Sequence, residues 1–92
     1  MQASEIFILS AQRTAIGTFG GALKDVPLGD LATTAVKAAL LNSQVDPERI
    51  GHVVMGNVIP TEPQDAYLAR VAAINAGIPK ETPAYNVNRL CG

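Results

Sequence analysis

Aromatic residues are scarce in this 92-residue sequence: tryptophan is absent, and there are only two tyrosines and two phenylalanines. Proteins that bind single-stranded nucleic acids stack bases on aromatic side chains, so this class is disfavoured. A formal net charge of −1 supplies no basic surface for a nucleic acid. The seven Lys and Arg residues form no run that would hold an anionic membrane. We therefore expect neither a nucleic-acid partner nor a membrane partner.

The sequence has one cysteine, Cys91, which excludes an internal disulfide and fits a reducing compartment. No apolar stretch approaches the about 18 residues that a membrane-spanning helix needs. Residues 1–5 have neither the basic start and apolar run of a secretion signal nor the Arg-rich character of a transit peptide. These absences lead us to expect a cytoplasmic protein.

Strand and helix patterns alternate along the first half of the chain. Residues 6–9 form a short apolar run, typical of a strand buried on both faces. Residues 28–40 carry apolar side chains at the i, i+3, i+4, i+7 spacing of an amphipathic helix. Pro27 suits the first turn of this helix, because its missing N–H has no partner to lose there.

The second half continues the alternation. Residues 52–59 are nearly continuously apolar and predict a second strand. Asp65 is a candidate N-cap for a second helix, which Gly77 and Pro79 would end. Residues 82–87 predict a third strand.

The order strand, helix, strand, helix, strand predicts an α/β fold with a mainly parallel sheet and crossover helices. The chain is long enough for one small domain. A parallel sheet is normally covered by helices on both faces. Two helices cannot cover both faces of three strands, so we expect one covering layer to be missing.

Two features suggest a ligand site but have simpler explanations. The glycine-containing loop at residues 17–21 matches neither of the common nucleotide-binding spacings, which favours a plain connector. His52 is the only histidine, and no Cys, Asp or Glu lies near it at metal-ligand spacing. We therefore predict no metal-binding and no cofactor-binding residue in this sequence. We also assign no catalytic role to His52.

Four other polar or aromatic residues are also explained structurally. Glu62 and Asp65 precede a predicted helix, where solvent exposure and capping account for both carboxylates. Tyr67 and Tyr85 are most simply part-buried core residues with a polar tip. None of the four is predicted to be catalytic.

The context of Cys91 favours chemistry over the default of an inert, buried thiol. It follows a predicted buried strand and precedes Gly92, where the chain turns sharply. Such a turn raises a side chain at the carboxyl ends of the strands, where ligands bind, and resembles the serine elbow of hydrolases. A helix starting just after it would favour the thiolate and could hold an oxyanion. We predict that Cys91 is an acyl-accepting nucleophile.

Four segments resemble the thiolase family in order and spacing. Asn88-Arg89-Leu90-Cys91-Gly92 resembles the start of the thiolase active-site motif, N-x-x-C-G-S-G. Residues 11–17 resemble the family's R-T-P/A-I-G stretch, and residues 54–58 resemble its second-strand motif. Residues 69–79 fit the helix that follows. The resemblance covers residues 6–92 and is strongest to the bacterial acetyl-CoA acetyltransferase and beta-ketothiolase group.

The resemblance implies that residues 1–92 are an incomplete N-terminal thiolase domain. It implies an acyltransferase that condenses two acetyl-CoA molecules, or an acyl-CoA with acetyl-CoA, to a 3-ketoacyl-CoA, or cleaves that product with CoA, through an acyl group on Cys91. Coenzyme A thioesters are then substrates, and no cofactor is bound. The family's G-H-P histidine and C-x-G cysteine have no match in this sequence, so we expect the chain alone to be inactive.

The resemblance also implies a homodimer or a homotetramer. In thiolases the strand before the nucleophile pairs with its counterpart across a two-fold axis. This would place the following residues near the dimer interface: Ala84, Tyr85, Asn86, Val87 and Asn88.

Two alternatives stay open from the sequence. A ketoacyl synthase relative would share the fold and a cysteine at the matching turn, although residues 13–17 and 88–92 favour a thiolase. The second alternative is a non-catalytic short protein that binds CoA or a full-length partner. Open strand edges and an exposed apolar face would favour aggregation of such a protein.

Overall fold

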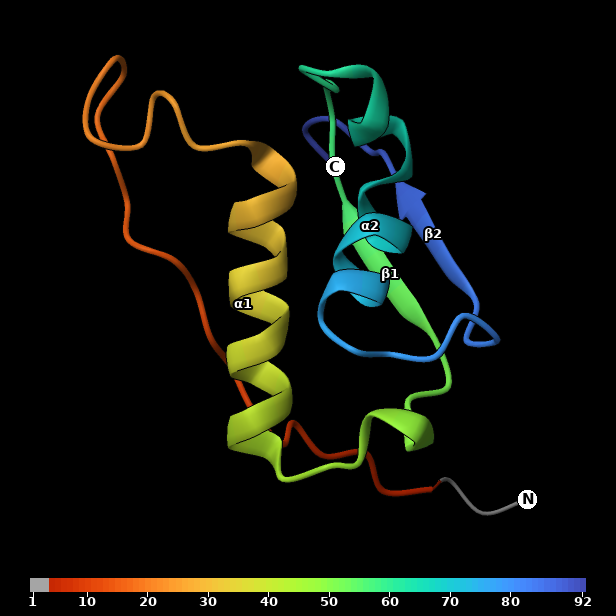
Figure 1. Cartoon of the computed structure of the whole chain (residues 1–92). Coiled ribbons are helices and arrows are strands. Elements are labelled where there is room, and N and C mark those ends of the chain that lie inside the picture. Colours follow the sequence, from red (N-terminus) through yellow and green to blue (C-terminus); the bar gives the residue numbers. More distant parts are fainter. Residues whose placement is uncertain (1–3) are drawn as a thin grey trace.

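The computed structural model describes residues 4–92 and confirms the α/β class (Figure 1). The first three residues, on which the expectation about a leader sequence partly rests, lie outside the described residues. The elements in chain order are helix α1 (Leu28–Ser43), a 3-10 helix (Pro47–Arg49), strand β1 (Val53–Gly56), a second 3-10 helix (Pro63–Tyr67), helix α2 (Leu68–Asn75) and strand β2 (Ala84–Val87).

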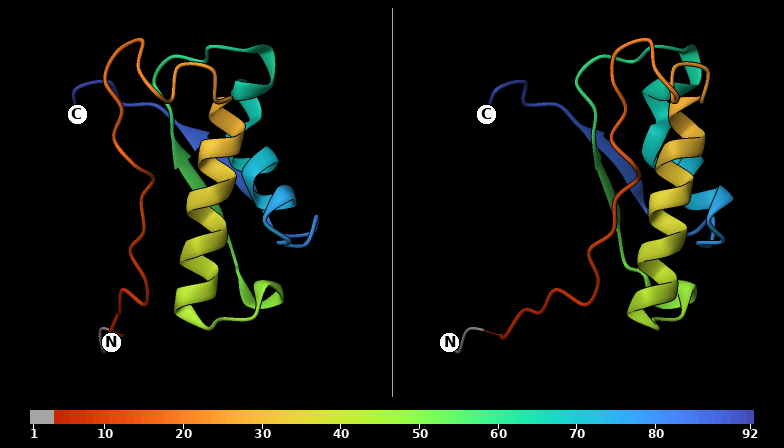
Figure 2. Two further views of the ribbon diagram at one scale, coloured as in Figure 1. Left: turned by 60° about the vertical axis from the view of Figure 1, so that its left-hand side comes forward. Right: turned by 90° about the vertical axis from the view of Figure 1, so that its left-hand side faces the viewer.

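The two strands are parallel neighbours, with Val53 opposite Ala84 and Gly56 opposite Val87. Helix α2 lies between them in sequence and packs against both, and α1 packs against α2 (Figures 1 and 2). This is the crossover connection that a parallel pair requires. Between residues 4 and 92, no helix combines the length and apolar character that crossing a bilayer would demand.

Helix α1 forms as the apolar spacing predicts. It ends at Ser43, three residues after the last apolar residue of the predicted pattern, Leu40. Pro27 stands immediately before its first residue. At the other end Gln44 adopts a left-handed conformation, with φ of 59°, and its N–H donates to the Leu41 carbonyl. This is a common way to satisfy one of the free carbonyls at a helix end.

A small core joins the strands to α2. Val53 of β1 packs with Ala69 and Ala73 of α2 and with Ile78, and all four side chains are buried. The two alanines are one helical turn apart and therefore lie on the same face of α2. Their small side chains let the helix axis come close to the sheet.

The opposite face of the strand pair is open. Side chains alternate between the faces of a strand, so Val54, Tyr85 and Val87 point away from α2. They are 51%, 52% and 45% exposed. The expectation of an uncovered sheet face is confirmed for the described residues.

The predicted strand at residues 6–9 is not formed. These residues carry no regular secondary structure, and Figure 2 shows them in an extended arm that is not part of the sheet. Ile6 and Ile8 are about nine-tenths exposed. An apolar run indicates that a segment tends to be buried, but a strand also requires a hydrogen-bonded neighbour, and the described sheet contains only β1 and β2.

The other two predicted strands are real but shorter than predicted. Strand β1 covers four residues of the predicted 52–59, because its ladder ends where β2 ends. Strand β2 begins at Ala84 because Pro83 has no N–H to donate to a ladder, although its carbonyl still accepts from the Val53 N–H at 2.9 Å.

The start of the second helix was predicted incorrectly. Asp65 is the N-cap of neither helix: Glu62 is the N-cap of the 3-10 helix, and Tyr67 is the N-cap of α2, which begins at Leu68. Tyr67 is also more exposed than predicted, at 69%, because it lies at the junction of the two helices on the outer surface.

Asp65 is buried, contrary to the expectation of exposure, and is only 2% exposed. One of its carboxylate oxygens accepts three hydrogen bonds: from the Thr61 N–H at 3.0 Å, the Thr61 hydroxyl at 2.7 Å and the Glu62 N–H at 2.8 Å. The Thr61 hydroxyl is the main cause that lowers the pKa of Asp65 below 3.8; burial opposes it, and the two backbone N–H groups add to the lowering.

We expect Ile78→Ala to lower the free energy of unfolding by about 2–5 kcal/mol, because it opens a cavity in the small core. Ile74→Ala is the matched control, since Ile74 lies on the neighbouring helix and is 45% exposed. It should cost about 1 kcal/mol or less. Urea unfolding of both variants measures the difference, and equal losses would contradict this assignment of the core.

We expect the ionised Asp65 to stabilise the fold in a pH-dependent way. Its pKa is lower in the folded chain than in the unfolded chain, so the stabilisation is present above the unfolded pKa and is lost as the pH falls through the folded pKa. Asp65→Asn should therefore reduce the loss of stability on acidification from pH 6 to pH values below 3.8.

The control for this experiment is Asp25→Asn, which removes an exposed carboxylate from a loop. Urea midpoints measured across the pH range for both variants give the comparison. If Asp65→Asn loses as much stability on acidification as the wild-type chain, the ionised Asp65 carboxylate does not stabilise the fold.

Candidate active site

The candidate site lies where β1 and β2 both end. Because the strands are parallel, the loops that follow Gly56 and Val87 leave the sheet at the same edge. Figure 1 shows the C-terminal segment at this edge, beside the loop that connects β1 to the second 3-10 helix. Ligands of parallel α/β sheets bind at this edge, in the crevice outside the carboxyl ends of the strands.

Cys91 lies in a tight turn four residues after the end of β2. Its thiol is free and the residue is exposed. The Gly92 N–H donates to the Arg89 carbonyl at 2.7 Å, which closes the turn around Leu90 and Cys91. Leu90 has a positive φ of 40°, a conformation that residues with a β-carbon rarely adopt. Such backbone conformations gather at functional sites, which accords with the predicted sharp turn.

Asn88 connects this turn to the loop after β1. Its amide nitrogen donates to the Val58 carbonyl at 2.8 Å. Its amide oxygen accepts from the Leu90 N–H at 3.2 Å. The side chain therefore bridges the segments that follow the two strands.

Asn86 forms a second bridge, between β2 and the start of α2. Its amide oxygen accepts from the Ala69 N–H at 2.8 Å, and its amide nitrogen donates to the carbonyls of Ala66 and Asp65 at 3.1 and 3.2 Å. Helix starts have N–H groups without partners inside the helix, and Asn86 satisfies one of them from the neighbouring strand.

The roles of Asn86 and Asn88 were not recognised from the sequence, which predicted only their nearness to a dimer interface. A signal was available, since asparagine is uncommon in strands. Two asparagines at alternate positions through and just after a predicted strand indicate side chains that bind neighbouring backbone.

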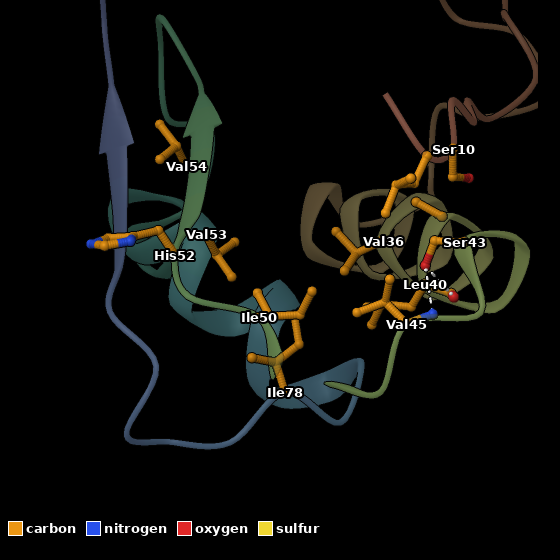
Figure 3. Close-up of a pocket in the computed structure, with 12 residues that line it drawn as sticks. Ser10, Val36, Leu40, Ser43, Val45, Ile50, His52, Val53, Val54 and Ile78 are labelled. Atoms are coloured by element: carbon orange, nitrogen blue, oxygen red, sulfur yellow. Dashed lines mark hydrogen bonds between the residues drawn. The ribbon is translucent and has the colours of Figure 1, made fainter. Parts of the chain in front are cut away.

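His52 lies away from the candidate site. It immediately precedes the amino end of β1, whereas Cys91 follows the carboxyl end of β2, so the two residues lie at opposite ends of the strand pair. His52 borders a cavity of about 380 Å³ between α1 and the sheet. Figure 3 shows Val36 and Leu40 on one side of this cavity, and the His52 ring pointing away from them.

The other candidates contribute no assembled site. The loop at residues 17–21 is a turn, in which Gly20 has φ of 69° and the Gly21 N–H donates to the Thr18 carbonyl at 2.9 Å. Among residues 4–92, no group of three His, Cys, Asp or Glu side chains lies close enough to hold a metal ion.

Comparison with known proteins identifies relatives of this chain. The family model described as the thiolase N-terminal domain matches residues 6–92. The beta-ketothiolase BktB of Cupriavidus necator is 56% identical over 88 residues, a match that covers 96% of this chain and 22% of that protein. The human mitochondrial 3-ketoacyl-CoA thiolase is 48% identical over 87 residues, covering 95% of this chain and 22% of that protein.

Solved structures agree. The crystal structure of human mitochondrial 3-ketoacyl-CoA thiolase in complex with CoA superposes with a TM-score of 0.89 at 49% identity, over 94% of this chain and 22% of that one. The Bacillus anthracis acetyl-CoA acetyltransferase superposes with a TM-score of 0.83 at 38% identity, over 91% of this chain and 21% of that one. The chain thus spans about a fifth of the length of the relatives it matches, and it belongs to the thiolase family, within the N-terminal domain.

Proposed function

We propose that the protein containing this chain is a thiolase-type acyltransferase in which Cys91 carries the acyl group. The observation that carries the proposal is the position of Cys91, on a tight turn at the carboxyl edge of a parallel strand pair. The turn belongs to a chain that is 56% identical to a beta-ketothiolase over nearly its whole length.

In the first half of the proposed reaction, the Cys91 thiolate attacks the carbonyl carbon of an acyl-CoA. A bond forms between that carbon and Sγ, the bond to the sulfur of CoA breaks, and CoA leaves as a thiolate that takes up a proton. One thioester replaces another, so the step is nearly balanced in free energy and can run in either direction.

In the second half, an acetyl-CoA loses an α-proton to a base from another part of the protein. The resulting carbanion attacks the acyl carbon on Cys91, the new carbon–carbon bond forms, and the Cys91 thiolate leaves. The product is a 3-ketoacyl-CoA. The reverse sequence cleaves a 3-ketoacyl-CoA with free CoA, so the proposed activity is that of an acetyl-CoA C-acetyltransferase or a 3-ketoacyl-CoA thiolase.

Coenzyme A thioesters are the proposed substrates. The human relative was crystallised in complex with CoA, which supports this substrate class for a chain 49% identical to it. A thioester is already activated for acyl transfer and for loss of an α-proton. The proposed chemistry therefore uses no additional bound cofactor and no metal.

A homodimer or homotetramer in the cytoplasm is the proposed form of the protein. Strand β2 has one neighbour in the described sheet, so its outer edge presents unpaired backbone groups that a second copy could pair with. Tyr85 and Val87 flank this edge on the open face of the sheet. Asn86 and Asn88 already bind backbone within the chain, which leaves the strand's main chain as the proposed contact.

We expect Cys91→Ser, made in the full-length protein, to lower thiolysis of acetoacetyl-CoA by at least about a thousandfold, because removing a nucleophile eliminates the covalent route. The melting temperature should stay within a few degrees, since the side chain is exposed. Incubation with acetyl-CoA should add one acetyl group to the wild-type protein at Cys91 and none to the variant. Acetylation at another residue would contradict the proposal.

We also expect the isolated 92-residue chain to catalyse neither thiolysis nor condensation. The thiolase resemblance implies a histidine in a G-H-P segment and a second cysteine in a C-x-G segment, and residues 1–92 contain neither. The measurement is CoA-dependent loss of acetoacetyl-CoA absorbance, with the full-length protein as positive control. Turnover by the purified chain would show that these groups are dispensable.

Sedimentation and circular dichroism of the same sample test the remaining alternative. A compact monomer that unfolds cooperatively and binds CoA without turnover would favour a short binding protein over part of an enzyme. The exposed apolar face of the sheet argues against this outcome.

A further inference from the structure

The Asn88 side chain links the two chain segments just beyond the last backbone hydrogen bond of the strand ladder. The last main-chain bond across the pair runs from the Asn57 N–H to the Val87 carbonyl, at 3.1 Å. One residue further on, the contact between the two segments is made by a side chain, from the Asn88 amide nitrogen to the Val58 carbonyl at 2.8 Å. The two residues are thirty positions apart in sequence. This bond therefore fixes the turn that contains Cys91 relative to the loop after β1.

The other end of the same amide acts on the turn itself. The Asn88 amide oxygen accepts from the Leu90 N–H at 3.2 Å, which is the local turn that asparagine side chains form with backbone two residues on. Leu90, the residue next to Cys91, has the unusual positive φ. Its conformation persists only where surrounding contacts impose it. Asn88 supplies one of those contacts, and the Gly92-to-Arg89 bond supplies another.

We propose that Asn88 is a positioning residue, which holds the Cys91 thiol in its reactive geometry by joining the Val58 carbonyl to the Leu90 N–H. The inference rests on the proposed function, because it assigns a purpose to the position of Cys91. Asn88 itself does not touch the reacting atoms and acts through the conformation of the turn.

The amide of asparagine is suited to this position because both of its polar ends are used. A carboxylate could accept from Leu90 but could not donate to Val58. A serine hydroxyl is shorter and could form only the weaker local turn. Alanine would form neither bond and would leave the loop free to move away from the strand. A displacement of about 1 Å at a reacting centre can cost about a hundredfold in rate.

Asn86 is the matched control. It lies two positions earlier, within β2, and its amide makes two hydrogen bonds to the second 3-10 helix and one to the first turn of α2. Asn86→Ala removes three hydrogen bonds, one more than Asn88→Ala, but leaves the Cys91 turn intact. A general loss of stability would affect both variants, whereas a loss of positioning would affect only Asn88→Ala.

The experiment measures acetylation of Cys91 in the full-length protein, by quenched mass spectrometry over a range of acetyl-CoA concentrations. We expect Asn88→Ala to lower the maximal rate about 10- to 100-fold, while the acetyl-CoA concentration for half-maximal rate changes less than about threefold. Asn86→Ala should stay within about threefold of the wild-type rate below its melting temperature. Asn88→Ser should give an intermediate rate and serves if the alanine variant does not fold.

Equal losses in the Asn86 and Asn88 variants, or a wild-type maximal rate in Asn88→Ala, would overturn the inference. A second readout separates it from the proposed function. If wild-type Cys91 takes up no acetyl group, the proposed function is wrong. The role of Asn88 is then decided by alkylation of Cys91 with iodoacetamide, whose rate should change at least about threefold in Asn88→Ala and not in Asn86→Ala. No change in either variant would overturn the inference.

Discussion

The close approach of α2 to the parallel strands is the contact on which the rest of this structure depends. Ala69 and Ala73 are fully buried against Val53 and Ile78, and no larger side chain would allow the same separation. This packing fixes the helix across both strands. The two strands beneath it are parallel, with Gly56 opposite Val87, so β1 and β2 end at the same edge. Cys91 reaches its position only because that edge is well defined.

Polar side chains then hold the segments that surround the short strands. Asp65 organises the segment before the second 3-10 helix, Asn86 joins β2 to the start of α2, and Asn88 joins the turn that contains Cys91 to the loop after β1. Asn88 continues the contact between the two strand ends, where the four-residue ladder stops, whereas Asp65 and Asn86 bind backbone groups outside the ladder. Buried polar groups need such partners, and here the partners are also what hold the loops.

The described part of the chain positions Cys91, the proposed nucleophile, but contains no neighbouring group that would activate its thiol. Cys91 is exposed, and the single histidine lies at the opposite end of the strand pair. A thiolase mechanism also needs a base for the α-proton of the second substrate. The chain spans 22% of the length of its relatives, and its proposed contribution is the acyl-carrying cysteine with the scaffold that holds it.

The sequence by itself determined the order of α1, β1, α2 and β2, because apolar periodicity and the Pro and Gly signals are local properties. It also supported the thiolase resemblance, now confirmed, and singled out Cys91 by its place after a strand. Only the tertiary structure decided that residues 6–9 form no strand, because strand formation depends on a partner that an apolar run does not specify. It likewise decided that Asp65 is buried and that Asn86 and Asn88 bridge segments. Their hydrogen bonds to Ala69, to Asp65 and to Val58 span 17, 21 and 30 positions, and no local pattern encodes such separations.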